Sequence, residues 1–353
     1  MNDSSARPRR SALDRRGFLT FGVGAGAWMG LLNARAPSAQ GQATLRSIDM
    51  HAHWTPVSYN RALSEVGSTP RQNNSPYNLD LGQRVQWMDE HGVQVHCLTI
   101  LTPPWDWASP EFAAHLTRVV NDAAIEAHRA YPDRFVAGVA MPIQEPELAL
   151  AELNRVAGNP TFRAVHLPNA HAGKDYLFEP EFEPILARCQ ELELPLLFHP
   201  LGGDRPGADR LAGPAFLNNS IGNPFEHTIT AAKFITTGTL DKFPTLEILL
   251  AHAGGAFPIV AGRVEHGLAR SNITLPRPFM EYVRRFHYDT IAYYPETLRF
   301  LIDLVGADRV VIGTDYFARM DVEDTAGLVE SLNLPAADQE LILSGNARRL
   351  LKL

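Results

Sequence analysis

From residue 44 to the C-terminus, short apolar runs alternate with longer amphipathic runs. The short runs are rich in valine, isoleucine and leucine, and four of them end in a histidine or an aspartate. A run that is apolar at successive positions is typical of a strand buried on both faces, as in a parallel sheet. We therefore predict eight strands, at residues 44–51, 93–100, 134–141, 162–168, 194–199, 245–252, 286–291 and 309–315.

The amphipathic runs between these strands carry helix signals. Ser109 and Pro110 provide an N-cap and a first helical turn, and Gly92 provides a C-terminal stop. The predicted helices lie at residues 81–91, 109–131, 145–157, 179–193, 224–237, 295–305 and 335–351. This alternation of strands and helices predicts the α/β class and, within it, a (β/α)8 TIM barrel.

Two long connections interrupt the alternation, at residues 54–80 and 200–224, and both are rich in Gly, Pro, Asn and Ser. Each follows the carboxyl end of a predicted strand, which is the active-site face of a barrel. We expect both to be loops that cover a substrate.

Residues 1–43 differ in composition from the rest of the chain. Arg15 and Arg16 precede a Gly- and Ala-rich apolar run, and small-residue sites such as Ala34-Arg35-Ala36 follow it. This order is typical of a signal peptide, and the paired arginines resemble a twin-arginine signal. The apolar run is shorter than the roughly 20 residues that span a bilayer. We therefore predict export to the periplasm, cleavage that leaves no stable membrane span, and a mature barrel domain at residues 44–353.

The charge and the cysteines narrow the picture further. A net charge of −7 argues against a nucleic-acid partner, because such proteins carry a basic face. The length of 353 residues is compatible with one large barrel. The two cysteines, Cys97 and Cys189, lie in apolar runs and are interpreted as buried free thiols, although an oxidising compartment would also permit a disulfide.

Five polar residues stand at the carboxyl ends of predicted strands: His51, His53, His199, His252 and Asp315. Residues two apart in an extended segment point the same way, so the first two imidazoles can face one point. Barrel strands converge at their carboxyl ends, so all five side chains are expected around one site. Three imidazoles and a carboxylate suit a zinc-like ion with one position left for water.

The other histidines do not share this placement. They fall inside strands, in helices, in loops or at a strand start, where a hydrogen-bonded structural histidine is the more frequent case. We interpret all of them as structural: His91, His96, His115, His128, His166, His171, His227, His266 and His287.

The segments IDMHAHWTP, LLFHP, AHAGGAFP and RVVIGTDY resemble the amidohydrolase superfamily. The similarity runs from about residue 46 to the C-terminus and is strongest to the branch of amino-carboxymuconate-semialdehyde decarboxylase and related nonoxidative decarboxylases. It implies one acid/base residue, His252, and four metal ligands: His51, His53, His199 and Asp315. A bound ion lowers the pKa of water, and His252 would take that proton and return it.

The resemblance also implies two substrate-binding arginines, Arg84 and Arg263, whose forked hydrogen bonds would hold an anionic substrate. Family members often form homodimers in which an arginine reaches the neighbouring pocket, so we expect a homodimer and a possible role for Arg263 in its partner. Dinuclear relatives use a lysine at the end of strand four. Strand four here reads FRAVHLPNA, so we expect one divalent ion, zinc first and manganese second.

Three functions are compatible with this site. The first is a carbon–carbon lyase that removes CO₂ from an unsaturated or aromatic, hydroxybenzoate-like acid. The second is a metal-dependent hydrolase of an ester, lactone or amide, because the same fold and metal site serve both chemistries. The third is a non-enzymatic binding protein with a vestigial site, which the intact set of five residues argues against. We rank the decarboxylase first.

Overall fold

The computed structural model describes residues 46–66, 80–100, 105, 107–171, 173–200, 206–316, 318, 320–322 and 324–353. The predicted signal peptide lies outside these residues and stays a prediction. Residues 67–79 and 201–205 of the two long connections lie outside them as well. Within the described ranges, no helix is both long enough and apolar enough to cross a membrane.

Eight parallel strands form one sheet in the order of the sequence, as predicted. Their bounds are β1 Ser47–Trp54, β2 Val93–Ile100, β3 Phe135–Val139, β4 Phe162–Leu167, β5 Leu196–Phe198, β6 Ile248–Leu250, β7 Phe286–Asp289 and β8 Val310–Val311. The segment that continues β8 pairs with β1: the Met50 amide donates to the Ile312 carbonyl at 2.9 Å, and the His53 amide donates to the Tyr316 carbonyl. These bonds close the barrel and confirm the predicted fold.

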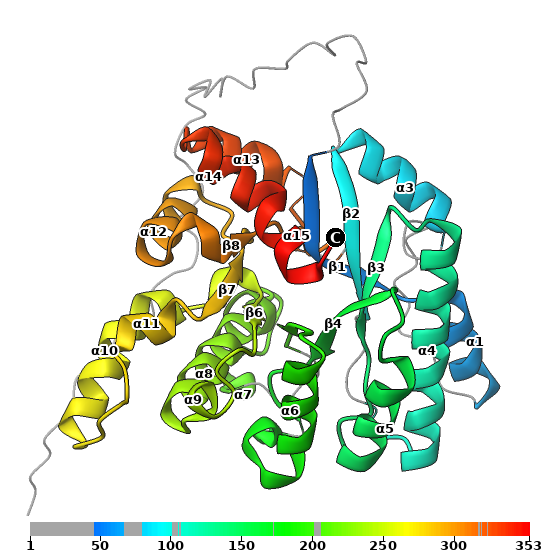
Figure 1. Ribbon diagram of the computed structural model, residues 1–353, viewed down its shortest axis with the longest axis horizontal. Coiled ribbons are helices and arrows are strands. Elements are labelled where there is room, and N and C mark those ends of the chain that lie inside the picture. The colour runs from blue at the N-terminus through cyan, green and yellow to red at the C-terminus, as the bar shows by residue number, and fades with distance from the viewer. Residues whose placement is uncertain are drawn as a thin grey trace, which may run out of the picture. The chain divides into compact units, whose positions relative to one another are not determined.

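Helices follow the strands and lie around them (Figure 1). Their bounds are α1 Val57–Glu65, α3 Leu81–Glu90, α4 Pro110–Ala130, α5 Pro146–Val156, α6 Glu183–Glu191, α7 Ala208–Leu211, α8 Asn223–Thr236, α9 Thr239–Lys242, α10 Phe257–Arg270, α11 Phe279–Val283, α12 Pro295–Val305, α13 Thr325–Ser331, α14 Ala336–Glu340 and α15 Asn346–Leu351. Every predicted helix is found, and the predicted caps are in place: the Ser109 side chain accepts a hydrogen bond from the Phe112 amide.

Apolar side chains fill the inside of the barrel. Met50, Cys97, Leu197 and Leu249 from four different strands belong to one buried cluster, together with residues of α15. A larger cluster packs the outer faces of the strands against the helices. Cys97 and the helical Cys189 are both buried and free, which confirms the interpretation as free thiols.

Two expectations about connections were incomplete. The segment 54–80 is not wholly a loop, because it contains α1. Tyr59, Ala62 and Leu63 recur at the spacing of one helical face and pack in a buried cluster with Trp105, which stabilises the helix. The helix α10, which was not predicted, begins at Phe257, the last residue of the AHAGGAF segment. Gly262 and Gly267 interrupt its pattern, so its apolar face is hard to detect in the sequence.

Replacing Gly255 with alanine is expected to destabilise the protein by about 2–4 kcal/mol. Gly255 has φ +66°, and a Cβ there would lie 1.9 Å from the Pro224 carbonyl oxygen. The matched change Gly262→Ala lies in α10 with no atom within 4 Å of the new Cβ. It should be neutral or raise the stability by about 0.5–1 kcal/mol. Equal denaturation midpoints for the two variants would contradict this explanation of the AHAGGAFP motif.

Candidate metal centre

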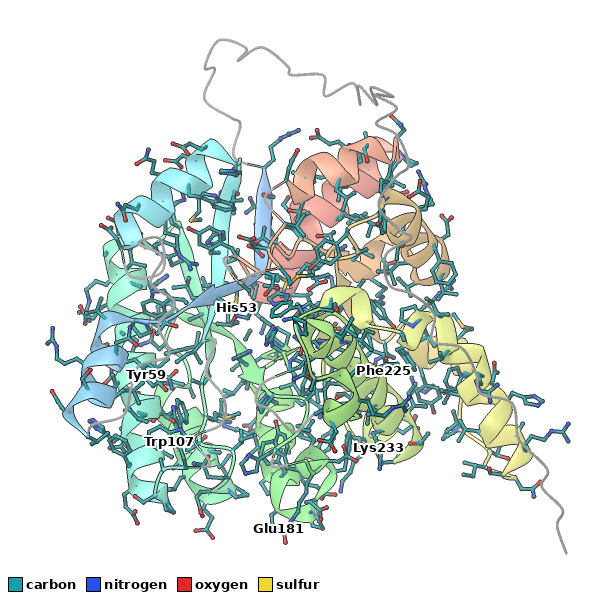
Figure 2. All side chains as sticks on the ribbon, turned by 180° about the vertical axis from the view of Figure 1, so that it is seen from behind. His53, Tyr59, Trp107, Glu181, Phe225 and Lys233 are labelled. Carbon is teal, nitrogen blue, oxygen red and sulfur yellow. The ribbon has the colours of Figure 1, made fainter. Side chains whose placement is uncertain are left out.

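Four predicted side chains meet at the carboxyl end of the barrel. His51 and His53 lie on β1, His199 directly follows β5, and Asp315 follows the segment that continues β8. All four are buried, and one ligand atom from each lies within 4.8 Å of the others. Figure 2 shows His53 toward the middle of the barrel and Glu181 at its outer edge. These four residues form a group that can hold one metal ion.

The ring nitrogens of β1 and the Asp315 carboxylate point at one spot. His53 Nε2 lies 2.8 Å from Asp315 Oδ1, and His51 Nε2 lies 3.4 Å from the same oxygen. The two Nε2 atoms are 3.3 Å apart. Nitrogens that approach one carboxylate oxygen and each other in this way are suited to share an ion, and imidazole with carboxylate is a ligand set that zinc and similar divalent ions accept.

The charges around this spot also favour a cation. Burial raises the pKa of the Asp315 carboxyl, but the neighbouring imidazoles of His252, His51 and His53 outweigh it and hold that pKa well below its usual range. For the Asp289 carboxyl on β7, burial is likewise outweighed, chiefly by the hydrogen bond from His51, and its pKa is lowered. Two ionised carboxylates therefore lie beside the buried imidazoles, and a divalent cation would balance their charge.

The imidazoles on β1 respond to these carboxylates in opposite ways. For His51, burial lowers the pKa, but the Asp289 and Asp315 carboxylates outweigh it and raise the pKa to about 10. For His53, burial dominates and lowers the pKa to about 4. The hydrogen bond to Asp289 is the largest of the contributions that raise the pKa of His51.

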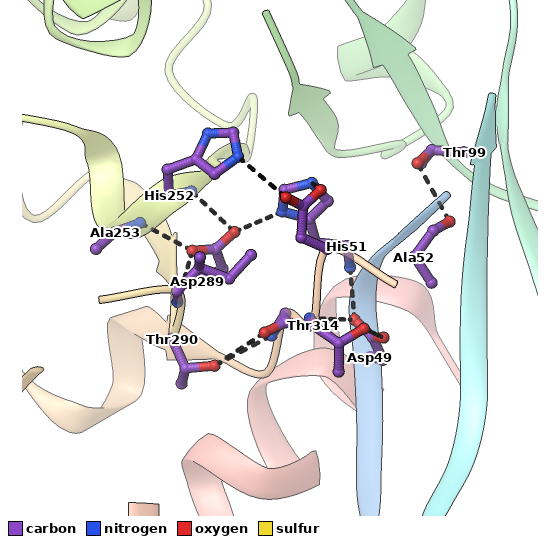
Figure 3. Close-up of polar contacts among 12 residues, drawn as sticks. Asp49, His51, Ala52, Thr99, His252, Ala253, Asp289, Thr290 and Thr314 are labelled. Carbon is purple, nitrogen blue, oxygen red and sulfur yellow. Dashed lines mark hydrogen bonds and ion pairs between the residues drawn. The ribbon is translucent and has the colours of Figure 1, made fainter. Parts of the chain in front are cut away.

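Asp289 was not identified from the sequence. Its carboxylate accepts hydrogen bonds from His51 Nδ1 at 2.7 Å, from the His252 amide at 3.0 Å and from the Ala253 amide at 2.8 Å (Figure 3). It therefore orients a ligand and the turn that carries His252. No strand-end signal in the sequence indicated it, because Asp289 lies inside the predicted strand 286–291, whereas the observed β7 ends at Asp289.

Replacing Asp289 with asparagine is expected to weaken metal binding by about 10–100-fold, the usual effect of losing a carboxylate behind a ligating histidine. The amide keeps an acceptor for the backbone but loses the charge that holds His51. The measurement is a competition titration with a metal-binding dye. The matched control is Glu247→Gln. Glu247 Oε2 pairs at 2.9 Å with buried His287, which lies on β7 as Asp289 does. Equal affinity in the Asp289 variant and the native protein would contradict this role.

Backbone conformations at the site are held by buried polar groups. Asp315 has φ +58° and His252 has φ +54°, both in the left-handed region that non-glycine residues rarely adopt. Thr314, next to Asp315, donates its hydroxyl to Asp49 Oδ2 at 2.5 Å, which ties the two ligand-bearing segments together. Gly313 permits the close approach of this segment to Asp289, because a Cβ there would lie 2.8 Å from the Asp289 Cβ. Strain of this kind is typical of functional sites.

His252 lies beside the four ligands and is not one of them. Its Nε2 is 3.9 Å from Asp315 Oδ2, and its ring centre is 5.2 Å from that of His51 and 5.3 Å from that of His199. Its side chain is 11% exposed, against 2–5% for the nearby ligands on β1. This position is the one expected for a group that meets the substrate.

The two predicted arginines are placed differently from each other. Arg84, on α3, is fully buried: its guanidinium donates to the His53 carbonyl, lies 3.3 Å from His96 Nδ1 and stacks 4.6 Å above the Tyr316 ring. Arg263 is exposed on α10. The guanidinium of Arg84 therefore supports the β1 backbone at a ligand. A substrate contact by either arginine stays a prediction.

Strand four offers no lysine to the centre. His166 occupies β4, is buried, and has its ring centre 6.3 Å from that of His199. Lys174 lies beyond the strand and pairs through its backbone with His171. Within the described ranges, the one group of three or more potential ligands is the set at the barrel mouth, which agrees with a single ion.

The sequence pattern of the Amidohydrolase family matches residues 48–353. The chain belongs to the amidohydrolase family. This match covers the whole barrel, including all four members of the group that can hold a metal, and agrees with the resemblance seen in the short segments.

This chain is similar to 2-amino-3-carboxymuconate-6-semialdehyde decarboxylase of Dictyostelium discoideum, with 29% identity over 276 residues that cover 76% of each chain. It is equally similar to gamma-resorcylate decarboxylase of Rhizobium sp. (strain MTP-10005), with 29% identity over 76% of this chain and 86% of the relative. Both lie in the branch expected from the sequence.

Solved structures of relatives share the fold. A 2,6-dihydroxybenzoate decarboxylase bound to 2,6-dihydroxybenzoate is 26% identical, with a TM-score of 0.74 over 88% of this chain and 100% of the other. A dihydroxybenzoic acid decarboxylase from Polaromonas sp. JS666, with bound manganese and the inhibitor 2-nitroresorcinol, is 27% identical, with a TM-score of 0.75 over 87% and 97%. The Polaromonas structure holds a divalent ion, manganese, and the sequence of this chain predicts a divalent ion as well.

Proposed function

We propose that the protein is a metal-dependent nonoxidative decarboxylase that acts on an aromatic, hydroxybenzoate-like acid. The observation that carries the proposal is the buried group of three histidines and Asp315, with His252 beside it, in a chain that is similar to decarboxylases of gamma-resorcylate and 2,6-dihydroxybenzoate. The hydrolase that the sequence also permits has no comparable support among these relatives.

His51, His53, His199 and Asp315 would hold the ion, with zinc first and manganese second. When bound, the ion supplies Lewis-acid chemistry that polarises a coordinated oxygen. In the reaction the bond between the ring carbon and the carboxyl carbon breaks, CO₂ leaves, the electron pair of that bond stays on the ring carbon, and this carbon takes up one proton that comes from the solvent. His252 faces the same space from the side, and we propose that it donates a hydrogen bond to an anionic oxygen of the substrate.

A second part of the proposal concerns the oligomeric state. We propose a homodimer in which Arg263, exposed on α10, contributes to the pocket of the neighbouring subunit. Analytical ultracentrifugation of the native protein should give the mass of two chains, and a monomer would contradict this part of the proposal.

We further propose that residues 1–43 direct the folded enzyme to the periplasm. The support is the paired arginines, the short apolar run and the small-residue sites. Replacing Arg15 and Arg16 with lysine should leave the protein in the cytoplasm of the producing cell. Export unaffected by this change would remove the basis for the twin-arginine route.

The test of the activity is a screen of the zinc- or manganese-loaded protein. One panel contains hydroxybenzoates and dienoic acids and is followed by CO₂ release. The other contains esters, lactones and amides and is followed by acid release. The proposal expects turnover in the first panel, and turnover confined to the second would replace the decarboxylase with a hydrolase.

A further inference from the structure

Behind His252 lies a chain of buried polar side chains that leads away from the metal centre. His227 Nε2, on α8, is 3.1 Å from His252 Nδ1. Asn169, which follows β4, places its amide nitrogen 3.2 Å from His227 Nδ1 and 2.8 Å from the Thr230 hydroxyl. Asn169, His227 and Thr230 are 2%, 0% and 3% exposed, so their hydrogen bonds are shielded from water.

The direction of these hydrogen bonds follows from Thr230. Its hydroxyl has one proton, and that proton is donated to the Glu226 carbonyl at 2.9 Å. Thr230 can therefore only accept from Asn169, which turns the amide nitrogen toward His227 as well. His227 Nδ1 must then accept, and the proton of the neutral His227 ring lies on Nε2, where it is donated to His252 Nδ1.

Burial supports a neutral His227. Loss of hydration lowers the pKa of this imidazole well below its usual range, and the neighbouring His252 lowers it further. Because His252 Nδ1 accepts, a neutral His252 carries its own proton on Nε2. That nitrogen faces Asp315 Oδ2 at 3.9 Å. The tautomer of His252 is therefore set from the side of His227.

We propose that His227, held by Asn169 and Thr230, is the positioning residue of His252 and fixes it as an Nε2–H donor to an anionic oxygen of the substrate. This inference rests on the proposed function for the identity of that oxygen. It narrows the acid/base role expected for His252, because a ring whose Nδ1 accepts from His227 offers a proton rather than a lone pair to the metal centre. A fixed donor in a buried site needs no reorganisation when an anion binds.

The direct test is the tautomer of His252 in the zinc-loaded protein without substrate. Two-bond correlation spectra of protein with ¹⁵N-labelled histidine distinguish Nε2–H from Nδ1–H, and His252→Gln and His227→Gln assign the two signals. The inference expects Nε2–H for both rings. A native His252 that is protonated on Nδ1 would overturn it. This result does not depend on turnover, so it is separate from any failure of the proposed function.

Asn169→Asp is designed to reverse the direction of the hydrogen bonds that run from residue 169 through His227 to His252. A carboxylate at this position accepts from His227 Nδ1–H, which leaves His227 Nε2 as an acceptor and moves the His252 proton to Nδ1. The spectra should show that change, with the zinc content unaltered. A His252 tautomer that does not respond to Asn169→Asp would show that the chain does not control it.

Two replacements of His227 separate positioning from packing. His227→Phe keeps a ring of similar size but no donor, whereas His227→Gln keeps an amide that can donate to His252 Nδ1. The phenylalanine variant should lose about 10–100-fold in kcat/KM with full metal content, as for other residues behind a functional side chain. The glutamine variant should recover most of this loss. Equal activity in the two variants would overturn the inference.

Discussion

His252→Ala is expected to lower kcat/KM for the decarboxylation by about 10²–10³, the usual cost of losing one positioned donor in a buried site. The variant should still bind about one zinc per chain, because the three imidazoles and the carboxylate that hold the ion remain. His252 lies outside the group of potential ligands, with its Nε2 3.9 Å from the Asp315 carboxylate. The measurements are steady-state kinetics and elemental analysis of the same preparation.

The matched control for this variant is His266→Ala, which removes an exposed imidazole on α10. Its activity and metal content should equal those of the native protein. Loss of metal together with loss of activity in His252→Ala would mean that His252 is a ligand. Full activity would mean that the substrate lies elsewhere in the barrel.

Asp315→Ala is expected to abolish both metal binding and turnover. The change removes the only carboxylate of the four-residue group, whose Oδ1 lies 2.8 Å from His53 Nε2 and 3.4 Å from His51 Nε2. Removing one of four ligands from a site of this kind, together with its charge, should lower activity by at least about 10³-fold at limiting metal. Dialysis followed by elemental analysis should find the variant essentially free of zinc.

Asp303→Ala provides the comparison, because Asp303 is an exposed carboxylate on α12. It should retain the native metal content and kinetics. An Asp315 variant that keeps its metal after dialysis would show that the ion is held by other residues.

The barrel could be predicted from the sequence because each of its strands is a local feature. Runs such as residues 93–100 and 162–168 are mostly apolar, and the structure places β2 and β4 there with at most one residue of difference. The convergence of His51, His199 and Asp315 then follows from the geometry of a closed parallel sheet. The helix α10 escaped prediction because its glycines weaken the local signal.

The residues behind the site could not be predicted in the same way, because their roles depend on partners far away in the chain. Asp289 meets His51 across 238 positions, and His227 meets His252 across 25. His227 lies in a helix, where a structural histidine is the usual case, and nothing nearby in the sequence indicates a partner. Asp289 lies inside the predicted strand 286–291, so the strand-end placement that it shares with the ligands is visible only in the structure.

Arg84 differs from these residues, because it lies close to the metal centre but is buried in the protein, where the resemblance implied contact with a substrate. The resemblance implied an arginine that contacts a substrate carboxylate. The structure buries Arg84 completely, with its guanidinium against the His53 carbonyl and over Tyr316, and burial lowers its pKa to about 10. Burial and pairing of this kind depend on how α3 packs on β1, which the helical pattern alone does not reveal.

The most direct test of a metal-dependent decarboxylase follows both products from one labelled substrate. The zinc- or manganese-loaded protein is incubated with 2,6-dihydroxybenzoate or a related hydroxybenzoate that carries ¹³C in its carboxyl group, beside a sample treated with a chelator. We expect labelled CO₂ and the decarboxylated phenol in equal amounts, no product after chelation, and recovery when the ion is restored. Equal turnover with and without the metal, or a product that retains the labelled carboxyl group, would contradict this expectation.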